Sequence, residues 1–222
     1  EWTSAAIDRC VALAATQPSD QPPSTPTPGP GLDLDLPGCV ELIANRGFEQ
    51  GLTGWQAQGA VNVGSSIRAT GAQSAHFSGG PSARGVLTQT FTFPTNATAA
   101  ILKFHYRIDT QDYGSGTTPD WPFDDWFTAE WRSTGGATLA QLLRTGNTAD
   151  TISAGLEWDE YFYRLDAQDL AALSDQSQLA LVFTSQNDSD IYPTDIWVDS
   201  VRLCARSELP VRSYLPLMTA DH

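Results

Sequence analysis

The chain has 222 residues, and its 12 basic and 26 acidic side chains give a formal net charge of −14 at pH 7. It therefore lacks the basic stripe that nucleic acids and anionic membranes attract, and we expect neither as a partner. No apolar run approaches the roughly 20 residues that a membrane-spanning helix needs. The 41% hydrophobic content is typical of a folded protein with a substantial core.

The N-terminal part of the sequence indicates export. It begins at Glu1 and shows no targeting segment, which predicts a mature secreted protein whose signal peptide has been removed. Residues 1–16 form a short N-terminal arm whose apolar spacing fits either a helix or a strand. Residues 17–38 form a Pro-rich linker, in which the density of proline excludes helices and sheet ladders and favours an extended conformation.

Residues 39–205 form the body of the chain. Short apolar or alternating runs recur there, separated by turns rich in Gly, Asn, Asp and Pro, and this predicts an all-β, antiparallel sandwich. We expect one short helical turn at 165–173 and an extended C-terminal tail at 206–222, which either frays or docks as a strand. The expected strands are 40–44, 60–63, 74–78, 85–93, 100–108, 126–133, 138–144, 160–165, 178–185 and 195–204.

Three segments of the body follow one pattern. They are NRGFEQG at 45–51 with Gly54 and Trp55 behind it, GAQSA at 71–75, and DIWVDSVRL at 195–203. In these segments the body resembles the jelly-roll domains of the carbohydrate-binding-module and galactose-binding-like type found in secreted bacterial proteins. The resemblance implies a jelly roll with Phe48 and Trp55 filling one end of the core.

In the resembling folds the first and last strands pair, which would bring Cys39 and Cys204 within reach of a disulfide. The bond would close a loop of 204 − 39 + 1 = 166 residues. If the bond forms, Cys10 has no partner within the chain, and an odd cysteine in a secreted protein is a candidate for a bond to a partner chain. The alternative is that all three cysteines are buried free thiols.

The resemblance also implies a structural Ca²⁺. The carried-over ligands are the carboxylates of Glu49 and Asp199, with the carbonyls near Arg46 and Gln73 as weaker candidates. Such hard oxygen ligands suit Ca²⁺, which would pin the chain termini and take no part in catalysis. The alternative is a pair of solvated carboxylates.

The segment 112–126 has the most unusual composition in the chain. Aromatic faces stack on sugar rings and carboxylates accept hydrogen bonds from sugar hydroxyls, so the segment could form a glycan-binding platform. Its aromatic side chains could instead cap the core or form a protein–protein contact. The candidate ligand-binding residues are Tyr113, Asp120, Trp121, Phe123, Asp124 and Trp126.

We expect no catalysis, because the sequence lacks a nucleophile elbow, a His-Glu-x-x-His motif and a Walker loop. His76 and His105 fall in strand patterns. The acidic run 157–160 does not complete the carboxylates of a jelly-roll glucanase, since Phe162 stands where the third acid would be. Two glycosylation sequons begin at Asn96 and Asn187.

Two functions remain open. A short arm, a linker and an apolar tail around one domain predict a secreted, non-catalytic subunit that polymerises into an extracellular filament or surface layer by strand addition. The alternative is a glycan-binding or adhesive module that takes a polysaccharide. A fragment of a larger secreted protein is a third possibility.

Overall fold

The computed structural model describes residues 38–110, 112, 124–147, 157–176 and 178–207. The arm, all but the last residue of the linker and the tail from residue 208 onward lie outside this part. So do five of the residues singled out above: Cys10, Tyr113, Asp120, Trp121 and Phe123.

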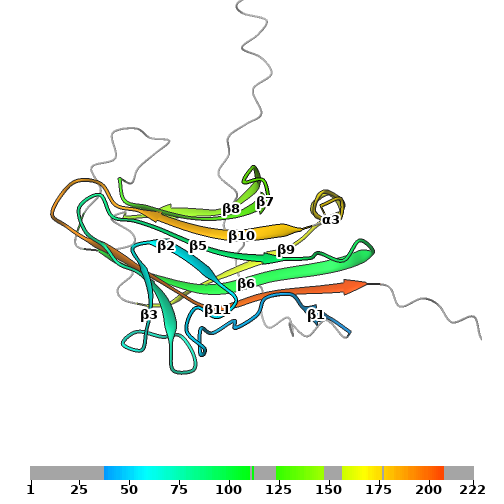
Figure 1. Ribbon diagram of the computed structural model, residues 1–222, viewed down its shortest axis with the longest axis horizontal. Helices are drawn as coiled ribbons and strands as arrows, with labels where there is room; N and C mark the ends of the chain where they lie inside the picture. Colours follow the sequence, from blue (N-terminus) through cyan, green and yellow to red (C-terminus); the bar gives the residue numbers. More distant parts are fainter. Residues whose placement is uncertain (1–37, 111, 113–123, 148–156, 177, 208–222) are drawn as a thin grey trace, which may run out of the picture. The chain divides into compact units, whose positions relative to one another are not determined.

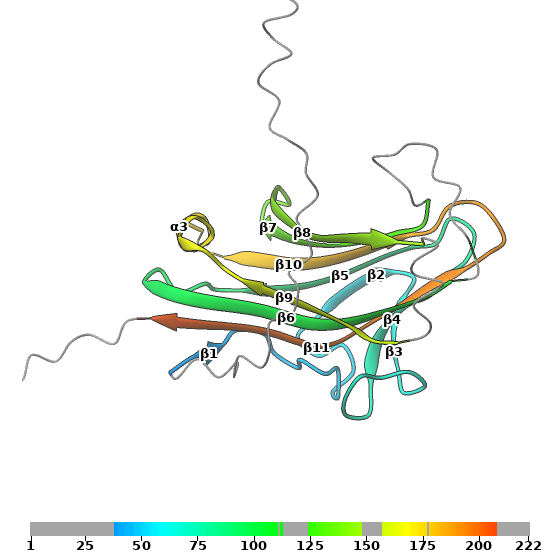
Figure 2. The same cartoon turned by 180° about the vertical axis from the view of Figure 1, so that it is seen from behind.

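The described residues form two antiparallel sheets that pack face to face as a jelly-roll sandwich (Figures 1 and 2). The first sheet has the order β3-β4-β11-β6-β9, and β1 pairs with the far end of β11. Its strands are β1 (Val40–Glu41), β3 (Val61–Gly64), β4 (Ser74–Phe77), β6 (Ala97–Thr110), β9 (Asp159–Arg164) and β11 (Thr194–Ser207).

The second sheet has the order β2-β5-β10-β7-β8. Its strands are β2 (Gln56–Gly59), β5 (Arg84–Phe91), β7 (Trp126–Ser133), β8 (Thr138–Gly146) and β10 (Leu179–Gln186). The sequence prediction of an all-β antiparallel sandwich is therefore confirmed. No helix among the described residues is long and apolar enough to cross a membrane.

Two details of the strand prediction were wrong. The expected strand 40–44 pairs only over Val40–Glu41, because the chain then turns into the 45–54 loop. Strand β2 was not predicted, since its sequence QAQG is polar, mostly exposed and free of β-branched residues. The expected helical turn is α3 (Ala167–Ser174), which Asp166 caps by accepting the N–H groups of Gln168 and Asp169.

Aromatic rings from both sheets fill the core. Phe183 of β10 stacks on Phe127 of β7, with 5.9 Å between ring centroids, and meets Phe104 of β6 edge-on at 5.0 Å. Phe48 and Trp55 are buried at one end, 5.2 Å apart, as the resemblance implied. Rings of this size supply much of the apolar area that drives the sheets together.

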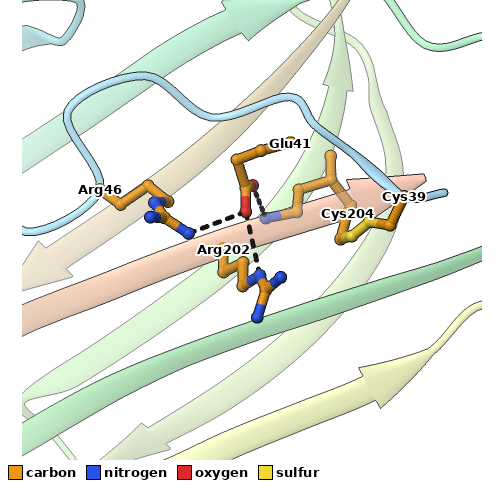
Figure 3. Close-up of a disulfide and its surroundings, with 6 residues drawn as sticks. Cys39, Glu41, Arg46, Arg202 and Cys204 are labelled. Atoms are coloured by element: carbon orange, nitrogen blue, oxygen red, sulfur yellow. Dashed lines mark hydrogen bonds and ion pairs between the residues drawn. A yellow bond between two sulfur atoms is a disulfide. The ribbon is translucent and has the colours of Figure 1, made fainter. Parts of the chain in front are cut away.

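The first and last strands are clamped together at β1 (Figure 3). A disulfide joins Cys39 to Cys204, whose Cα atoms are 5.7 Å apart, so the predicted pairing is confirmed. Beside it, the Glu41 carboxylate accepts the N–H of Leu203 at 2.8 Å and hydrogen bonds from Arg46 and Arg202 at 3.1 Å each. The clamp holds the start of the body against its last strand.

We predict that removing the disulfide strongly destabilises the fold. The double variant Cys39→Ser/Cys204→Ser should lose about 3–5 kcal/mol of unfolding free energy, because the bond closes a very long loop in the unfolded chain. Urea unfolding of oxidised and reduced protein measures the loss. A reductant should lower the unfolding free energy of the wild type to that of the double variant and leave the unfolding free energy of the variant unchanged. Equal stability of all four samples would contradict the prediction.

Candidate functional site

The outer face of the β2-β5-β10-β7-β8 sheet is the main candidate surface. Side chains alternate across a strand, so the inward positions Phe127, Phe183 and Leu87 leave their neighbours on the outer face. We call this surface the outer face. Its residues on the three inner strands are Arg84, Val86, Thr88, Thr90, Ala180, Val182, Thr184, Gln186, Trp126, Thr128, Glu130 and Arg132.

One row across the outer face carries buried polar groups. Thr184 of β10 pairs with Thr128 of β7, which in turn pairs with Arg144 of β8. The hydroxyls of Thr184 and Thr128 are buried and have no hydrogen-bond partner among the described residues. Burial also lowers the pKa of Arg144. Because unpaired buried polar groups are costly, this row is a place where a polar ligand or ordered water would stabilise the protein.

Trp126 lies in the next row, at the start of β7, where it pairs with Gln186 and Gly146. The Trp126 side chain is half-buried. Because its partner on β8 is Gly146, that position of β8 places no side chain beside the indole. Further along β7, Glu130 accepts hydrogen bonds from Arg132 at 2.8 Å and from Thr138 at 3.1 Å. The outer face thus combines one aromatic ring with a floor of small, hydroxyl and charged side chains.

Asp124 lies at the end of the outer face, two residues before the start of β7. The side-chain amide of Asn147 donates to Asp124 at 2.7 Å and to Asp112 at 2.6 Å. Of the six ligand-binding candidates from the sequence, the structure therefore places Asp124 and Trp126 at one sheet end. The other four lie outside the described residues.

The structure brings Glu49 and Asp199 together although 150 positions separate them. A Cβ on Gly47 would lie 3.7 Å from Glu49 Oε1 and 3.6 Å from Asp199 Oδ1, so both carboxylates border the same small space. Glu49 accepts the N–H of Ala72 at 2.8 Å. Asp199 is fully buried and accepts the N–H groups of Ala69, Thr70 and Ser200. Burial raises the pKa of Asp199.

The weaker calcium candidates differ in what they offer. The Gln73 side-chain oxygen is buried and has no hydrogen-bond partner among the described residues, which fits a cation ligand. The Arg46 carbonyl already accepts the N–H of Val201 at 2.9 Å, so only its second lone pair is left. This donor set consists of oxygen atoms alone, as Ca²⁺ prefers.

The first sheet presents a different surface, which the sequence did not predict. His76 stacks on Trp197 with ring centroids 4.6 Å apart, and the guanidinium of Arg107 covers the same indole at 5.8 Å. A hollow of about 520 Å³ opens between residues 66–71, Arg107 and Trp158. Both predicted strand histidines, His76 and His105, do lie on strands.

The two sequons differ in exposure. Asn96 is exposed in the turn before β6. Asn187 is 4% exposed, and its amide donates to the carbonyl of Thr194 at 3.2 Å. A glycan on Asn187 would have to break that hydrogen bond and displace the packing around it.

Strand alternation could have identified more of the outer face. The run WFTAEWRS at 126–133 alternates large apolar residues with Trp126, Thr128 and Glu130, so placing Phe127 in the core assigns the others to the opposite face. No comparable signal identified Arg144 or Asn147, because two irregularities in the β7–β8 pairing shift the register between the start of β8 and these residues.

Comparisons with known proteins agree with this fold. No protein-family profile matches the chain, and no curated protein does. A solved structure of TmCBM61 in complex with β-1,4-galactotriose is 16% identical and has a TM-score of 0.52, over 74% of this chain and 97% of that one. The chain thus shares the jelly-roll fold of carbohydrate-binding modules, and the resemblance drawn from the sequence is confirmed at that level.

Two further structures agree less closely. One is the CBM22-1 xylan-binding domain of Paenibacillus barcinonensis Xyn10C, at 18% identity, a TM-score of 0.46, and coverage of 78% of this chain and 98% of that one. The other is the K3 adhesin domain of Lys-gingipain from Porphyromonas gingivalis W83, at 13% identity, a TM-score of 0.47, and coverage of 75% and 99%.

The His76–Asp195 pair predicts a pH dependence of stability. The hydrogen bond from His76 at 2.7 Å is the main reason why the pKa of Asp195 lies below its ordinary value of 3.8, and the N–H of Gly79 assists. A depressed folded-state pKa stabilises the fold above the ordinary value, and the contribution is lost as the pH falls through the folded-state value.

Asp195→Asn should therefore lower the unfolding free energy at neutral pH, and its stability should converge with that of the wild type at acidic pH, below the folded-state pKa of Asp195. Urea unfolding across this range measures the difference between the two proteins. A constant difference at every pH would show that Asp195 acts through packing and not through its charge.

Proposed function

We propose that this chain is a non-catalytic, extracellular carbohydrate-binding domain that takes a polysaccharide on the outer face. The observation that carries the proposal is the pair of rows around Trp126. The half-buried indole of Trp126 lies one row from Arg144 and from the hydroxyls of Thr128 and Thr184, which have no hydrogen-bond partner among the described residues. Sugars need this combination, since an aromatic face packs on the ring and polar groups meet its hydroxyls.

The second sheet carries the proposed platform. The outer face lies on a five-stranded sheet, and its central strand β10 presents Ala180, Val182 and Thr184 there, followed by the exposed Gln186 at the strand end. Ala180, Val182 and Thr184 are buried, so we place the accessible part of the platform at the strand end, around Trp126 and Gln186. The fold shared with TmCBM61, whose structure contains β-1,4-galactotriose, adds independent support.

Charge and redox chemistry refine the proposal. A formal net charge of −14 repels acidic polymers, so the ligand we propose is a neutral polysaccharide. The Cys39–Cys204 disulfide is the kind of bond that persists in oxidising compartments, which supports an extracellular location. Filament assembly stays a sequence-based prediction, because its proposed arm and tail lie outside the described residues and the comparisons favour glycan binding.

Binding to neutral polysaccharides tests the proposal. Affinity electrophoresis against β-1,4-galactan, xylan and β-glucan should retard the wild type on at least one polymer. Trp126→Ala should weaken that binding at least about tenfold, because a buried aromatic anchor contributes roughly 1.4 kcal/mol or more. Trp158→Ala, directly before β9 of the first sheet, is the matched control and should bind normally. No retardation on any polymer, or equal loss in both variants, would contradict the proposal.

We further propose that Glu49 and Asp199 hold a structural Ca²⁺ with the Gln73 side-chain oxygen. The supporting observations are the two carboxylates beside Gly47 and the unpartnered buried oxygen of Gln73. The ion would tie the 45–51 loop to the bulge in β11 near Asp199, where the pairing of β11 with β6 is interrupted. It would supply charge neutralisation for a fully buried carboxylate.

Calcium should then raise the thermal unfolding temperature of the chelator-treated protein. By mass action, free Ca²⁺ at a hundred times its dissociation constant adds about 2.7 kcal/mol to the free energy of unfolding. Glu49→Gln and Asp199→Asn should reduce this shift by the contribution of this site, whereas Asp175→Asn, an exposed carboxylate at the end of α3, should keep the full shift. A shift of undiminished size in Glu49→Gln would exclude this site.

A further inference from the structure

We propose that Asp112, Asp124 and Asp125 form a second, separate site for a divalent cation, of the Ca²⁺ type, at the end of the outer face. The site follows from the geometry of these side chains and does not rest on glycan binding or on the Glu49–Asp199 site. It would neutralise a cluster of carboxylates beside the start of β7 in the second sheet.

The three carboxylates converge on one place. One carboxylate oxygen from each residue lies within 4.8 Å of the corresponding oxygens of the other two. Two oxygens bound to the same Ca²⁺ are at most about 5 Å apart, because each Ca–O distance is about 2.3–2.6 Å. The three oxygens are therefore close enough to share one Ca²⁺ ion.

Asn147 organises the cluster. Its side-chain amide donates to Asp112 and Asp124, and its side-chain oxygen accepts the N–H of Asp125 at 3.1 Å. The backbone N–H of Asn147 donates to the carbonyl of Asp125, also at 3.1 Å. One fully buried asparagine thus fixes the positions of all three aspartates before any ligand arrives, and such preorganisation favours binding.

A second observation, independent of the clustering, points to a ligand. Asp125 is fully buried, at 0% exposure. Its Oδ1 accepts the N–H of Asp188 at 2.7 Å, but its Oδ2 is buried and has no hydrogen-bond partner among the described residues. A buried carboxylate oxygen without a donor is expensive in free energy, and a bound cation would satisfy it directly.

The electrostatics favour a cation over other ligands. Burial raises the pKa of Asp125; the nearby Thr194 hydroxyl and the N–H of Asp188 oppose that rise, and the charges of Asp188 and Asp112 add to it. Four carboxyl groups thus share one region at the end of β7 and β10, which repels any anion. All the available donors are oxygen atoms, a set that selects Ca²⁺ over softer metals, which prefer nitrogen and sulfur.

The position connects the site to the outer face. Asp125 directly precedes Trp126, and Asn147 directly follows Gly146, the residue that pairs with Trp126. A cation held here would therefore lie at the same strand end as the indole. This neighbourhood gives a direct spectroscopic readout, because a nearby tryptophan sensitises the luminescence of bound Tb³⁺, which replaces Ca²⁺ in oxygen sites.

Titration of the full chain with Ca²⁺ and Tb³⁺ after chelation tests the proposal. We expect tryptophan-sensitised Tb³⁺ luminescence that Ca²⁺ displaces. Asp125→Asn and Asp124→Asn should each remove one bound equivalent of Ca²⁺ and most of the luminescence. Glu49→Gln should leave both signals of this site in place. Equal stoichiometry in the wild type and Asp125→Asn, or no bound cation in either, would overturn the proposal.

Unfolding in chelator separates a cation ligand from a purely structural residue. Asn at position 125 keeps an oxygen that can accept the N–H of Asp188 and removes a buried charge. Asp125→Asn should therefore be at least as stable as the wild type without Ca²⁺, and only the wild type should gain stability from Ca²⁺ at this site. A variant that is less stable in chelator and still binds the full complement of Ca²⁺ would contradict the assignment.

Discussion

The packing of Phe183 against Phe127 and Phe104 is the contact on which the rest of this structure depends. It places the odd-numbered positions of β10 in the core, and antiparallel pairing carries the same assignment to β5 and β7. A shift of one residue in register would exchange the two faces of these strands. The side chains proposed to meet a polysaccharide, Trp126, Thr128 and Thr184, are therefore on the outer face because large rings occupy the inner one.

A second constraint acts at the edges of the sandwich, where distant parts of the chain are tied together. The Cys39–Cys204 disulfide and the Glu41 carboxylate hold the first strand on the last one. Further along β11, the carboxylate of Asp199 accepts the backbone N–H of Ala69. Beside the start of β7, the carboxylate of Asp125 accepts the backbone N–H of Asp188. Buried carboxylates thus organise loops at several points. Two of these buried carboxylates, Asp199 and Asp125, lie where the proposed cations would neutralise them.

Much of the fold could be predicted because its signals are local. Alternation and turn residues identified most strands, and the NRGFEQG and DIWVDSVRL segments indicated the jelly roll and the neighbouring Cys39 and Cys204. Strand β2 was missed because an exposed polar edge strand has no apolar pattern. The candidate site was only partly predictable. Composition drew attention to Asp124 and Trp126, but Arg144, Thr184 and Asn147 meet them only through sheet pairing between distant segments, which local sequence patterns do not report.

The central claim is that the outer face binds a neutral polysaccharide, and amide chemical-shift mapping by NMR tests it most directly. The ¹⁵N-labelled chain would be titrated with an oligosaccharide from a polymer that it binds. The account predicts that the shifted amides lie on β5, β7, β8 and β10, centred on Trp126, Thr128 and Thr184, and that β3, β4 and β6 are unaffected. Shifts centred instead on the hollow between residues 66–71 and Trp158, or no shifts with any neutral oligosaccharide, would contradict it.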